Sequence, residues 1–237
     1  EVLQEATAAL SAAQRIARVG SWAWRFSDQR VTWSTELFHI IGLDPRHPPP
    51  DLHAALAELV HPEDRAAFRA TVIEHGPETM ASAAPPPPLE FRLIRPDGAV
   101  RHLRSEVGER RRDGGGRLLL ATGIVQDITE RKATEARIRQ LSRLYRAASR
   151  CSRAVVHCRT AEELWAEACR AAVEEGGLKL AWIGLVEASG AIRPAALYPP
   201  ENSHLKDLHI VTAATDPQGQ GPTGTAVREG RAVWCQD

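Results

Sequence analysis

Four cysteines and nine histidines are the residues of this 237-residue chain most suited to metal or redox chemistry. No two cysteines form a Cys-x-x-Cys pair, and no histidine stands at zinc-ligand spacing from them. We therefore expect no metal site, and reduced thiols at Cys151, Cys158, Cys169 and Cys235. A redox or haem role is the alternative; the possible haem ligands are His39, His61, His75 and His102, each more typical of a surface or capping position.

A glycine motif near the end of the chain matches the Gly-x-Gly-x-x-Gly sequence of dinucleotide-binding loops. Gly219, Gly221 and Gly224 have this spacing, but Pro217 precedes them and no clear strand leads in. We expect a loop that enters a helix. No Ser/His/Asp, paired-carboxylate or Walker-type set has a usable spacing, so the chain is predicted not to be an enzyme itself.

The run Asp127-Ile128-Thr129 stands where a strand pattern becomes a helix pattern. Thr129 can cap the helix, and Asp127 can accept a charge-assisted bond, with Arg101 as the expected donor. A simple helix cap is the alternative to a signalling role.

Composition excludes several classes of protein. The 30 basic and 30 acidic residues balance, which argues against a nucleic-acid surface. No run of about 18 apolar residues or signal-peptide pattern occurs, so we expect a cytoplasmic protein with no membrane contact in this segment. The chain does not start with Met, and we expect it to be a piece of a longer protein.

Periodicity in the first half predicts both helices and strands. Helices are expected over 2–19, 35–41 and 52–60, and a further helix is expected to begin at His61-Pro62. A loop is expected over 79–88. Strands are expected over 21–26, 31–33, 89–94, 100–110 and 118–126, the last three as an antiparallel meander. The fold class is therefore α+β.

Large apolar residues of the first half could line a ligand cavity, although plain core packing is the alternative. The candidates are Trp24, Trp33, Phe68, Phe91 and Leu103, with Trp182 in the second half.

A heptad pattern follows the sheet, in a helix expected over 129–157. Apolar and small residues recur at 3-4 spacing, which predicts a parallel homodimer through this helix. The seam consists of Ile138, Leu141, Tyr145, Ala148, Ser152 and Val155.

The rest of the chain predicts an incomplete α/β domain. Thr160 and Glu163 form a capping box that opens a helix to about residue 175. Strands are expected over 178–186, 191–197, 208–211 and 232–235, and a helix over 224–229. Because a sheet edge is left unpaired, we expect a truncated domain.

Residues 16–132 resemble the PAS family, in the branch with a Trp-rich first strand. The resemblance is carried by Trp22-Ala23-Trp24, Val31-Thr32-Trp33-Ser34, His61-Pro62-Glu63-Asp64, Arg95-Pro96-Asp97-Gly98 and Asp127-Ile128-Thr129-Glu130-Arg131-Lys132. It implies a five-stranded antiparallel sheet with helices, which binds a small ligand or a partner. It also implies that the Asp127–Thr129 junction passes strain from the sheet to the following helix.

Residues 145–237 resemble the N-terminal part of a GAF domain. The residues that match this family are Glu175-Gly176-Gly177, Leu180-Ala181-Trp182-Ile183-Gly184-Leu185 and 219–226. The expected organisation is an N-terminal helix over 1–19, a PAS domain over 20–130, a linker helix over 131–158 and a partial GAF domain over 159–237.

Such PAS–GAF pairs usually stand upstream of a cyclic di-GMP synthase or phosphodiesterase, or of a histidine kinase, so an output domain beyond this chain is expected. The alternatives are a scaffold that only dimerises and a cofactor-bearing redox or gas sensor. The flavin-binding PAS subclass uses a pocket cysteine, which residues 1–150 lack. No cofactor is required by the sequence, and neither haem nor flavin is expected.

Overall fold

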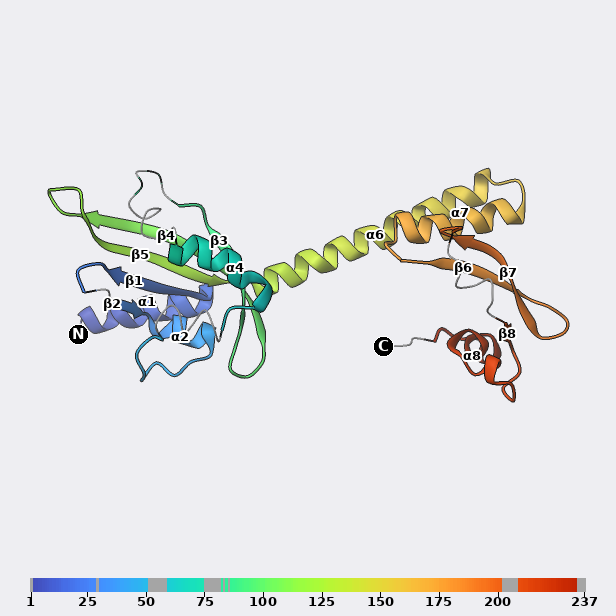
Figure 1. Ribbon diagram of the computed structural model, residues 1–237, viewed down its shortest axis with the longest axis horizontal. Helices are drawn as coiled ribbons and strands as arrows, with labels where there is room; N and C mark the ends of the chain where they lie inside the picture. Colours follow the sequence, from blue (N-terminus) through green and yellow to red (C-terminus); the bar gives the residue numbers. More distant parts are fainter. Residues whose placement is uncertain are drawn as a thin grey trace. The chain divides into compact units, whose positions relative to one another are not determined.

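The computed structural model describes residues 2–28, 30–50, 59–74, 82, 84, 86–201 and 209–233. The chain forms two compact units, Glu1–Glu135 and Ala136–Asp237, called unit 1 and unit 2 below. Figure 1 shows the elements of each unit.

Unit 1 contains a five-stranded antiparallel sheet. Its strands are β1 (Val19–Arg25), β2 (Arg30–Trp33), β3 (Leu89–Ile94), β4 (Val100–Arg112) and β5 (Leu118–Asp127), in the order β2-β1-β5-β4-β3. The expected meander of the last three strands is present. This sheet and its helices confirm the predicted fold class and are consistent with a PAS fold.

The helical elements of unit 1 are α1 (Val2–Ala17), α2 (Thr35–Ile41), η1 (Pro62–Asp64), α4 (Arg65–Phe68) and the π-helical η2 (Arg69–Glu74). The first helix ends two residues earlier than predicted. Arg18 has a φ of 52°, which breaks the helix, and Gly20 joins β1. The predicted helix over 52–60 and most of the loop over 79–88 lie outside the described residues, as does His75.

Helix α2 has well-defined ends. The Ser34 side chain accepts a bond from the Leu37 N–H, and Gly42 adopts the left-handed conformation at the other end. Arg95, which precedes the Pro96-Asp97-Gly98 turn, donates to the carbonyls of Ile40 at 2.8 Å and His39 at 2.9 Å. This arginine therefore holds the end of α2 against the β3–β4 hairpin.

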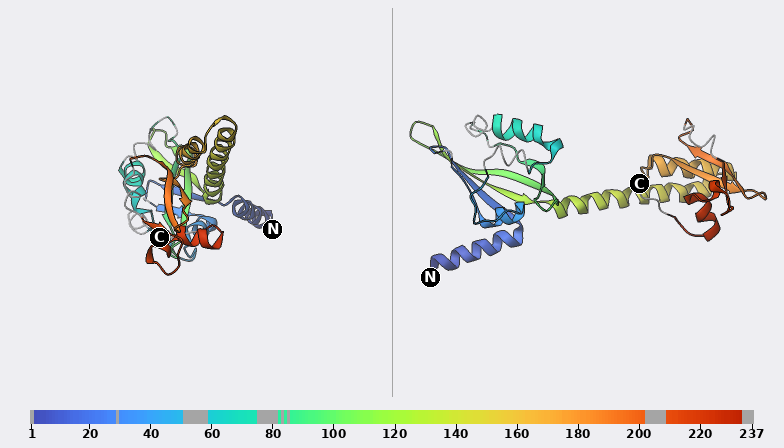
Figure 2. Two further views of the ribbon diagram at one scale, coloured as in Figure 1. Left: turned by 90° about the vertical axis from the view of Figure 1, so that its right-hand side faces the viewer. Right: turned by 60° about the horizontal axis from the view of Figure 1, so that its bottom comes forward.

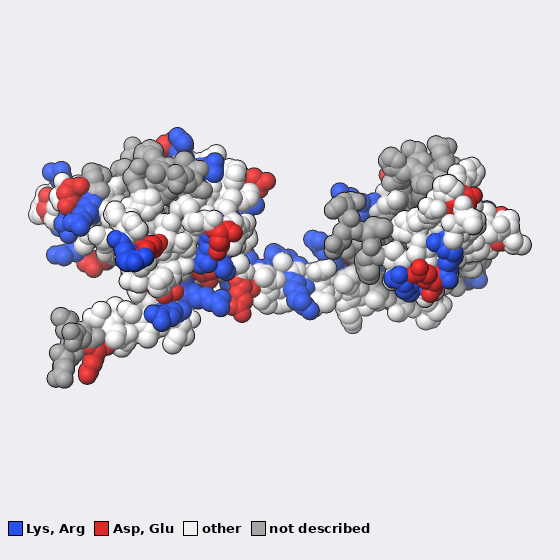
Figure 3. Space-filling model, turned by 90° about the horizontal axis from the view of Figure 1, so that it is seen from below, with Lys and Arg blue, Asp and Glu red and all other residues white. Residues whose placement is uncertain are grey.

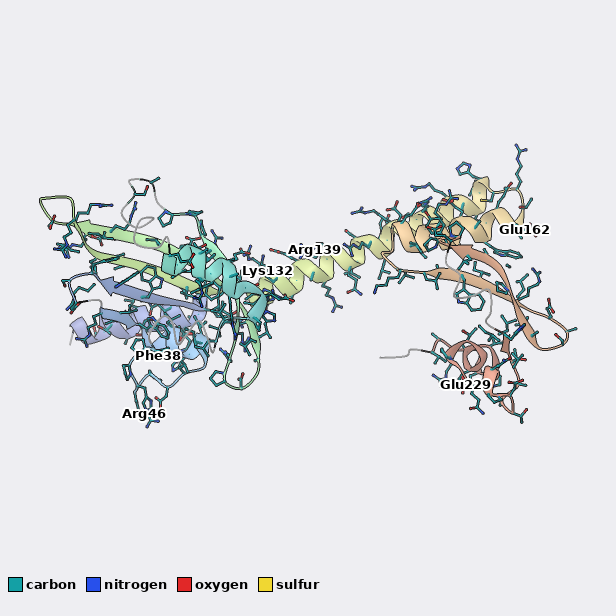
Figure 4. The ribbon with its side chains drawn as sticks, viewed as in Figure 1. Phe38, Arg46, Lys132, Arg139, Glu162 and Glu229 are labelled. Atoms are coloured by element: carbon teal, nitrogen blue, oxygen red, sulfur yellow. The ribbon has the colours of Figure 1, made fainter. Side chains whose placement is uncertain are left out.

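The core of unit 1 lies between α2 and the sheet. A side chain at Gly20 would collide with the backbone of Leu37, so this glycine allows α2 to approach β1 closely. Figure 4 shows Phe38 on α2. The buried cluster between this helix and the sheet is aliphatic and consists of Leu37, Ile40, Ile41, Leu59, Leu93, Leu103 and Val125.

Helix α6 (Thr129–His157) begins in unit 1 and ends in unit 2. Unit 2 continues with α7 (Ala161–Glu174), β6 (Ala181–Val186), β7 (Ala191–Tyr198), β8 (Ile210–Val211), η4 (Pro217–Gly219) and α8 (Pro222–Glu229). The strands pair in the order β6-β7-β8. Thr160 caps α7 as predicted, accepting from the Glu163 N–H at 3.2 Å.

Two strand predictions in unit 2 need correction. Strand β6 starts at Ala181 instead of 178, and its residues are mostly half-buried instead of buried. The structure gives residues 232 and 233 no strand conformation, and the rest of the strand expected there lies outside the described residues.

Two glycines of the motif in unit 2, Gly219 and Gly224, serve close backbone packing, whereas a side chain at Gly221 would meet no atom within 4 Å. Side chains at Gly219 or Gly224 would collide with carbonyl oxygens of Ala213, Val211 or Gly219 itself. Arg228 of α8 donates to the carbonyls of Thr212 and Gly219. The glycines therefore seat α8 against β8, which agrees with the expected loop entering a helix.

Among the described residues, no helix has the length and apolar character needed to cross a bilayer.

Candidate functional site

The exit from the sheet of unit 1 into α6 is held by a continuous set of hydrogen bonds. Asp127 Oδ1 accepts from the Thr129 N–H at 2.9 Å and from the Thr129 hydroxyl at 2.5 Å. The same hydroxyl accepts from the His102 N–H at 2.9 Å, while Ile128 donates to the His102 carbonyl at 2.8 Å. Main-chain atoms of β4 are thus bonded directly to the first residues of α6.

This arrangement differs from the predicted cap in one respect. The sequence predicts that Thr129 caps its own helix, but Thr129 is the first residue of α6. Its hydroxyl accepts a hydrogen bond from the His102 N–H of β4 instead. The capping acceptor for the Thr129 N–H is Asp127. The Thr129 hydroxyl therefore links the sheet to the helix.

The expected partner of Asp127 lies beside it. Arg101 Nη1 is 3.8 Å from Asp127 Oδ2, an ion-pair distance that is too long for a hydrogen bond. The Asp127 side chain is only 7 % exposed and that of Arg101 is 32 % exposed, so water screens this pair less than a surface pair. The relay role of these residues stays a prediction.

A second link joins the edge strand β3 to the first turn of α6. Glu90 accepts from Arg131 at 2.9 Å and from Lys132 at 2.5 Å. Hydrogen bonds from Lys132 and then Arg131 hold the pKa of the Glu90 carboxyl below its ordinary value. Figure 4 shows Lys132 on the first turns of the helix.

The N-terminal helix reaches the same junction. Arg18, between α1 and β1, donates through Nη1 to Glu130 at 2.7 Å, and its carbonyl accepts from the Asp127 N–H at 3.0 Å. Figure 3 shows acidic and basic side chains close together in this part of unit 1. The residue that follows α1 is therefore bonded to the first turn of α6.

A further ion pair fixes η1 against the sheet. Asp64 accepts from the Arg92 main-chain N–H at 2.7 Å and from two guanidinium nitrogens of Arg92, at 2.7 and 3.0 Å. These bonds lower the pKa of the Asp64 carboxyl. Glu63 adds a further bond to Arg92 at 2.7 Å.

The residues predicted to line a ligand pocket lie in several different environments. Leu103 is a fully buried core residue, and Trp33 packs partly against that core. Phe68 and Phe91 form an edge-to-face pair 4.8 Å apart. Trp182 belongs to β6 of unit 2, whereas the other candidates belong to unit 1.

Trp24 stacks on Phe26 with ring centroids 4.5 Å apart. Its indole N–H is buried and has no hydrogen-bond partner in the described part of the chain. An unpaired buried donor is unfavourable, and a bound acceptor would satisfy it.

The predicted dimer seam lies on the exposed side of α6. Ile138, Leu141 and Tyr145 are 58, 55 and 75 % exposed, and Val155 is 66 % exposed. Ala148 and Ser152, at the remaining seam positions, are exposed as well. The buried side of the helix is different, since Ala154 is 5 % exposed.

Unit 2 holds its end of α6 through a network that the sequence did not indicate. Arg150 donates to Glu167 at 2.6 Å and to Glu174 at 2.7 Å, both on α7. Tyr198 of β7 donates its hydroxyl to Glu174 at 2.6 Å. Hydrogen bonds from Tyr198 and then Arg150 lower the pKa of Glu174, and the same Glu174 contact raises the pKa of Tyr198.

Comparisons with known proteins give partial matches to this chain. No protein-family model matches the chain. A stretch of 129 residues, 54 % of this chain, is 32 % identical to blue-light-activated histidine kinases of Brucella ovis and Brucella abortus. The matched stretch is 24 % of each kinase, so the chain spans about a quarter of the length of these relatives.

Solved structures with a similar arrangement include a sensory box histidine kinase/response regulator from Burkholderia thailandensis, with a TM-score of 0.42 and 23 % identity. It aligns over 55 % of this chain and 92 % of that one. The N-terminal domain of a diguanylate cyclase with a PAS/PAC sensor from Marinobacter aquaeolei has a TM-score of 0.40 and 15 % identity, over 48 % of this chain and 98 % of that one. The five-stranded sheet of unit 1 is consistent with a PAS-like fold. The sequence similarity to histidine kinases covers about half of this chain.

Proposed function

We propose that this chain is the sensory and coupling portion of a signalling protein, without catalytic activity of its own. Unit 1 receives a ligand or partner signal, and α6 carries the resulting change towards an output domain outside this chain. The observation that carries the proposal is the bonding of His102, Asp127 and Thr129, which ties two strands to the first residue of α6. A shift of the sheet must therefore move or release the start of this helix.

The signal is proposed to be a small molecule held against the inner face of the sheet. The buried, unpaired N–H of Trp24 supports a ligand that offers an acceptor there. Photochemistry through a cysteine adduct is not part of the proposal, because no cysteine occurs before Cys151. Unit 2, with its resemblance to a GAF domain, is proposed as the second module of the same relay.

The output domain is proposed to be a cyclic di-GMP synthase or phosphodiesterase, as the PAS–GAF resemblance implies. A histidine kinase output is the second candidate, and the relatives of this chain favour it, since they are histidine kinases. The next few hundred residues of the full protein decide between them.

The relay is proposed to work in a parallel homodimer. The exposed 3-4 seam from Ile138 to Val155 supports this, because six seam positions remain free for a partner helix. Ala148 and Ser152 are small, so the coiled coil is weak alone and relies on further contacts.

Light scattering of a seam variant tests the dimer. Ile138→Asp combined with Leu141→Asp should give monomers, because two charges in the seam cannot be paired. The matched control is Arg139→Asp combined with Arg146→Asp, which changes exposed residues outside the seam and should leave the dimer intact. An unchanged dimer in the seam variant would refute this arrangement.

A further inference from the structure

The arginines of α6 are distributed unevenly. Residues 136–157 contain six arginines and no aspartate or glutamate. The first turns of the helix differ, because Arg131 there has Glu135 as an ion-pair partner four residues later. Five of the six arginines recur at 4-3-4-3 spacing and therefore lie along one side of the helix. This arginine stripe consists of Arg139, Arg143, Arg146, Arg150 and Arg153.

Such a stripe is unfavourable for the helix that carries it. Arginines three or four residues apart repel each other, and no acidic residue in this part of α6 offsets the repulsion. Arg139, Arg146 and Arg153 are exposed, and their side chains have no ion pair or hydrogen bond among the described residues. Within the described part of the stripe, only Arg150 has carboxylate partners. The helix therefore keeps a repulsion that a bound acidic group would relieve.

Helix α7 shows which group satisfies an arginine of the stripe. Glu167 and Glu174 are seven residues apart, so both lie on one side of α7. Both accept hydrogen bonds from Arg150, at 2.6 and 2.7 Å. These bonds, to Glu167 and then Glu174, raise the pKa of the Arg150 guanidinium above its ordinary value. A helix whose carboxylates repeat every seven residues is therefore already a partner of this stripe.

Helix α7 lies along the C-terminal part of α6 only, as Figure 1 and Figure 2 show. Arg150 bonds Glu174, the last residue of α7. Arg139 precedes Arg150 by about 16 Å along the helix, and Figure 4 shows it on α6 before this helix reaches α7. Arg139, Arg146 and Arg153 repeat every seven residues, which is also the repeat of the two glutamates. The exposed arginines therefore have the spacing that a second acidic helix could match.

The composition of the stripe favours carboxylates on a helix over other anions. Every residue of the stripe is arginine, whose planar guanidinium pairs with a carboxylate through two parallel hydrogen bonds. Phosphate offers a similar geometry, but the 30 basic and 30 acidic residues of the chain leave no basic excess for a nucleic acid. An anionic bilayer would also take up the apolar side of α6, which the proposed dimer occupies.

We propose that Arg139, Arg146 and Arg153 bind an acidic helix of a partner protein, whose carboxylates repeat at three, four and seven residues along one side. Arg150 stays bonded to α7. The partner helix lies along the exposed arginines and leaves the apolar seam of α6 free. The contact gives α6 a second input, which acts on the helix directly and does not pass through the sheet of unit 1. It depends neither on the ligand of unit 1 nor on the dimer.

Fluorescence anisotropy with a synthetic helical peptide tests the proposal. The peptide carries glutamates at three- and four-residue spacing along one side, and a second peptide of the same composition distributes them around the helix. The one-sided peptide should bind the 237-residue chain about tenfold more tightly, because it can form three ion pairs at once.

Variants with arginine replaced by glutamine locate the contact. The combination of Arg139→Gln, Arg146→Gln and Arg153→Gln should weaken binding about tenfold. Without peptide, this variant should be at least as stable to heat as the unchanged chain, because like charges have been removed. The matched control removes the same charge from exposed positions of unit 1, by Arg30→Gln, Arg111→Gln and Arg117→Gln. It should keep the affinity of the unchanged chain.

Other results would overturn the proposal. Equal affinity for the two peptides, or an equal loss in the control variant, would mean that only net charge matters. A DNA duplex or a phosphatidylserine vesicle that binds the same arginines more tightly than the peptide would identify another class of partner. If the full-length protein fails to bind the peptide that the 237-residue chain binds, a later segment of the same protein covers the stripe, and the proposal is wrong.

Discussion

The two units of this chain are stabilised by different kinds of interactions. Unit 1 has a continuous aliphatic core between α2 and a five-stranded sheet. The buried apolar residues described in unit 2 are fewer and mostly small: Ala154, Cys169, Ala171 and Ile192. There, half-exposed ionic contacts around Arg150 join α6 to α7.

This difference indicates how a helix shared by two units could transmit a change. Core packing is short-ranged and tolerates little displacement, so the sheet of unit 1 is expected to move as one body. Ion pairs between flexible side chains can adjust their geometry at small cost. We therefore expect α6 to follow unit 1 at its first turns, and unit 2 to accommodate small shifts at its end.

The largest effect is expected in the core of unit 1. Leu103→Ala should lower the free energy of unfolding of this unit by about 3 kcal/mol, because Leu103 is 1 % exposed and its removal leaves a cavity. Urea unfolding followed by tryptophan fluorescence measures the loss. Leu119→Ala, at a residue 41 % exposed, is the control and should change stability by less than about 1 kcal/mol. Equal losses would mean that the core does not dominate unit 1.

A smaller effect is expected in unit 2. Arg150→Met keeps the apolar stem but leaves Glu167 and Glu174 without their shared donor, at a cost of about 1–2 kcal/mol. Arg153→Met, at an exposed position of α6, is the control. If Arg150→Met unfolds unit 2 no more readily than the control does, the ionic network is not what holds α6 there.

The Asp64–Arg92 pair gives a test within unit 1. Asp64→Asn retains an acceptor for the Arg92 main chain but loses the charge, so the expected cost is about 1 kcal/mol. Because the folded-state pKa of Asp64 is lowered, its contribution is present above the ordinary carboxyl pKa of about 4 and is lost as the pH falls below it. Stability measured from pH 7 to pH 3 should therefore fall less steeply in the variant than in the unchanged chain.

The smallest effect concerns Tyr198. Its pKa is raised by Glu174, so its contribution is complete below about pH 10 and is lost as the pH rises through the folded-state value. Thermal unfolding of unit 2 should lose stability above pH 10, and Tyr198→Phe should weaken this dependence. An identical alkaline profile in the variant would show that the hydroxyl contact contributes nothing.

Local signals in the sequence predicted much of unit 1. The alternation of apolar and polar residues, together with turn motifs, predicted the strands. Ser34 and Gly42 predicted the ends of α2, because helix caps act within a few residues. The proximity of Arg101 and Asp127 could be expected because Arg101 lies at the start of β4 and Asp127 at the end of β5, its antiparallel neighbour.

Long-range contacts could not be predicted in the same way. The Thr129 hydroxyl was assigned to its own helix because its real partner, the His102 N–H, is 27 residues away. Arg150 occupies an ordinary polar position of a helix, and nothing in its neighbourhood indicated partners on α7. Gly219 and Gly224 matched a ligand-binding motif, although both serve close backbone packing.

The central claim is that the sheet of unit 1 controls the start of α6 through Asp127. Hydrogen exchange of the amides in the first two turns of α6, compared between the unchanged chain and Asp127→Ala, tests it most directly. The variant loses the acceptor for the Thr129 N–H and hydroxyl, so exchange of these amides should become about tenfold faster, which corresponds to about 1.4 kcal/mol. Amides of β1 and of α7 should keep their rates. Unchanged exchange at the start of α6 would contradict the account and leave Asp127 as a local cap.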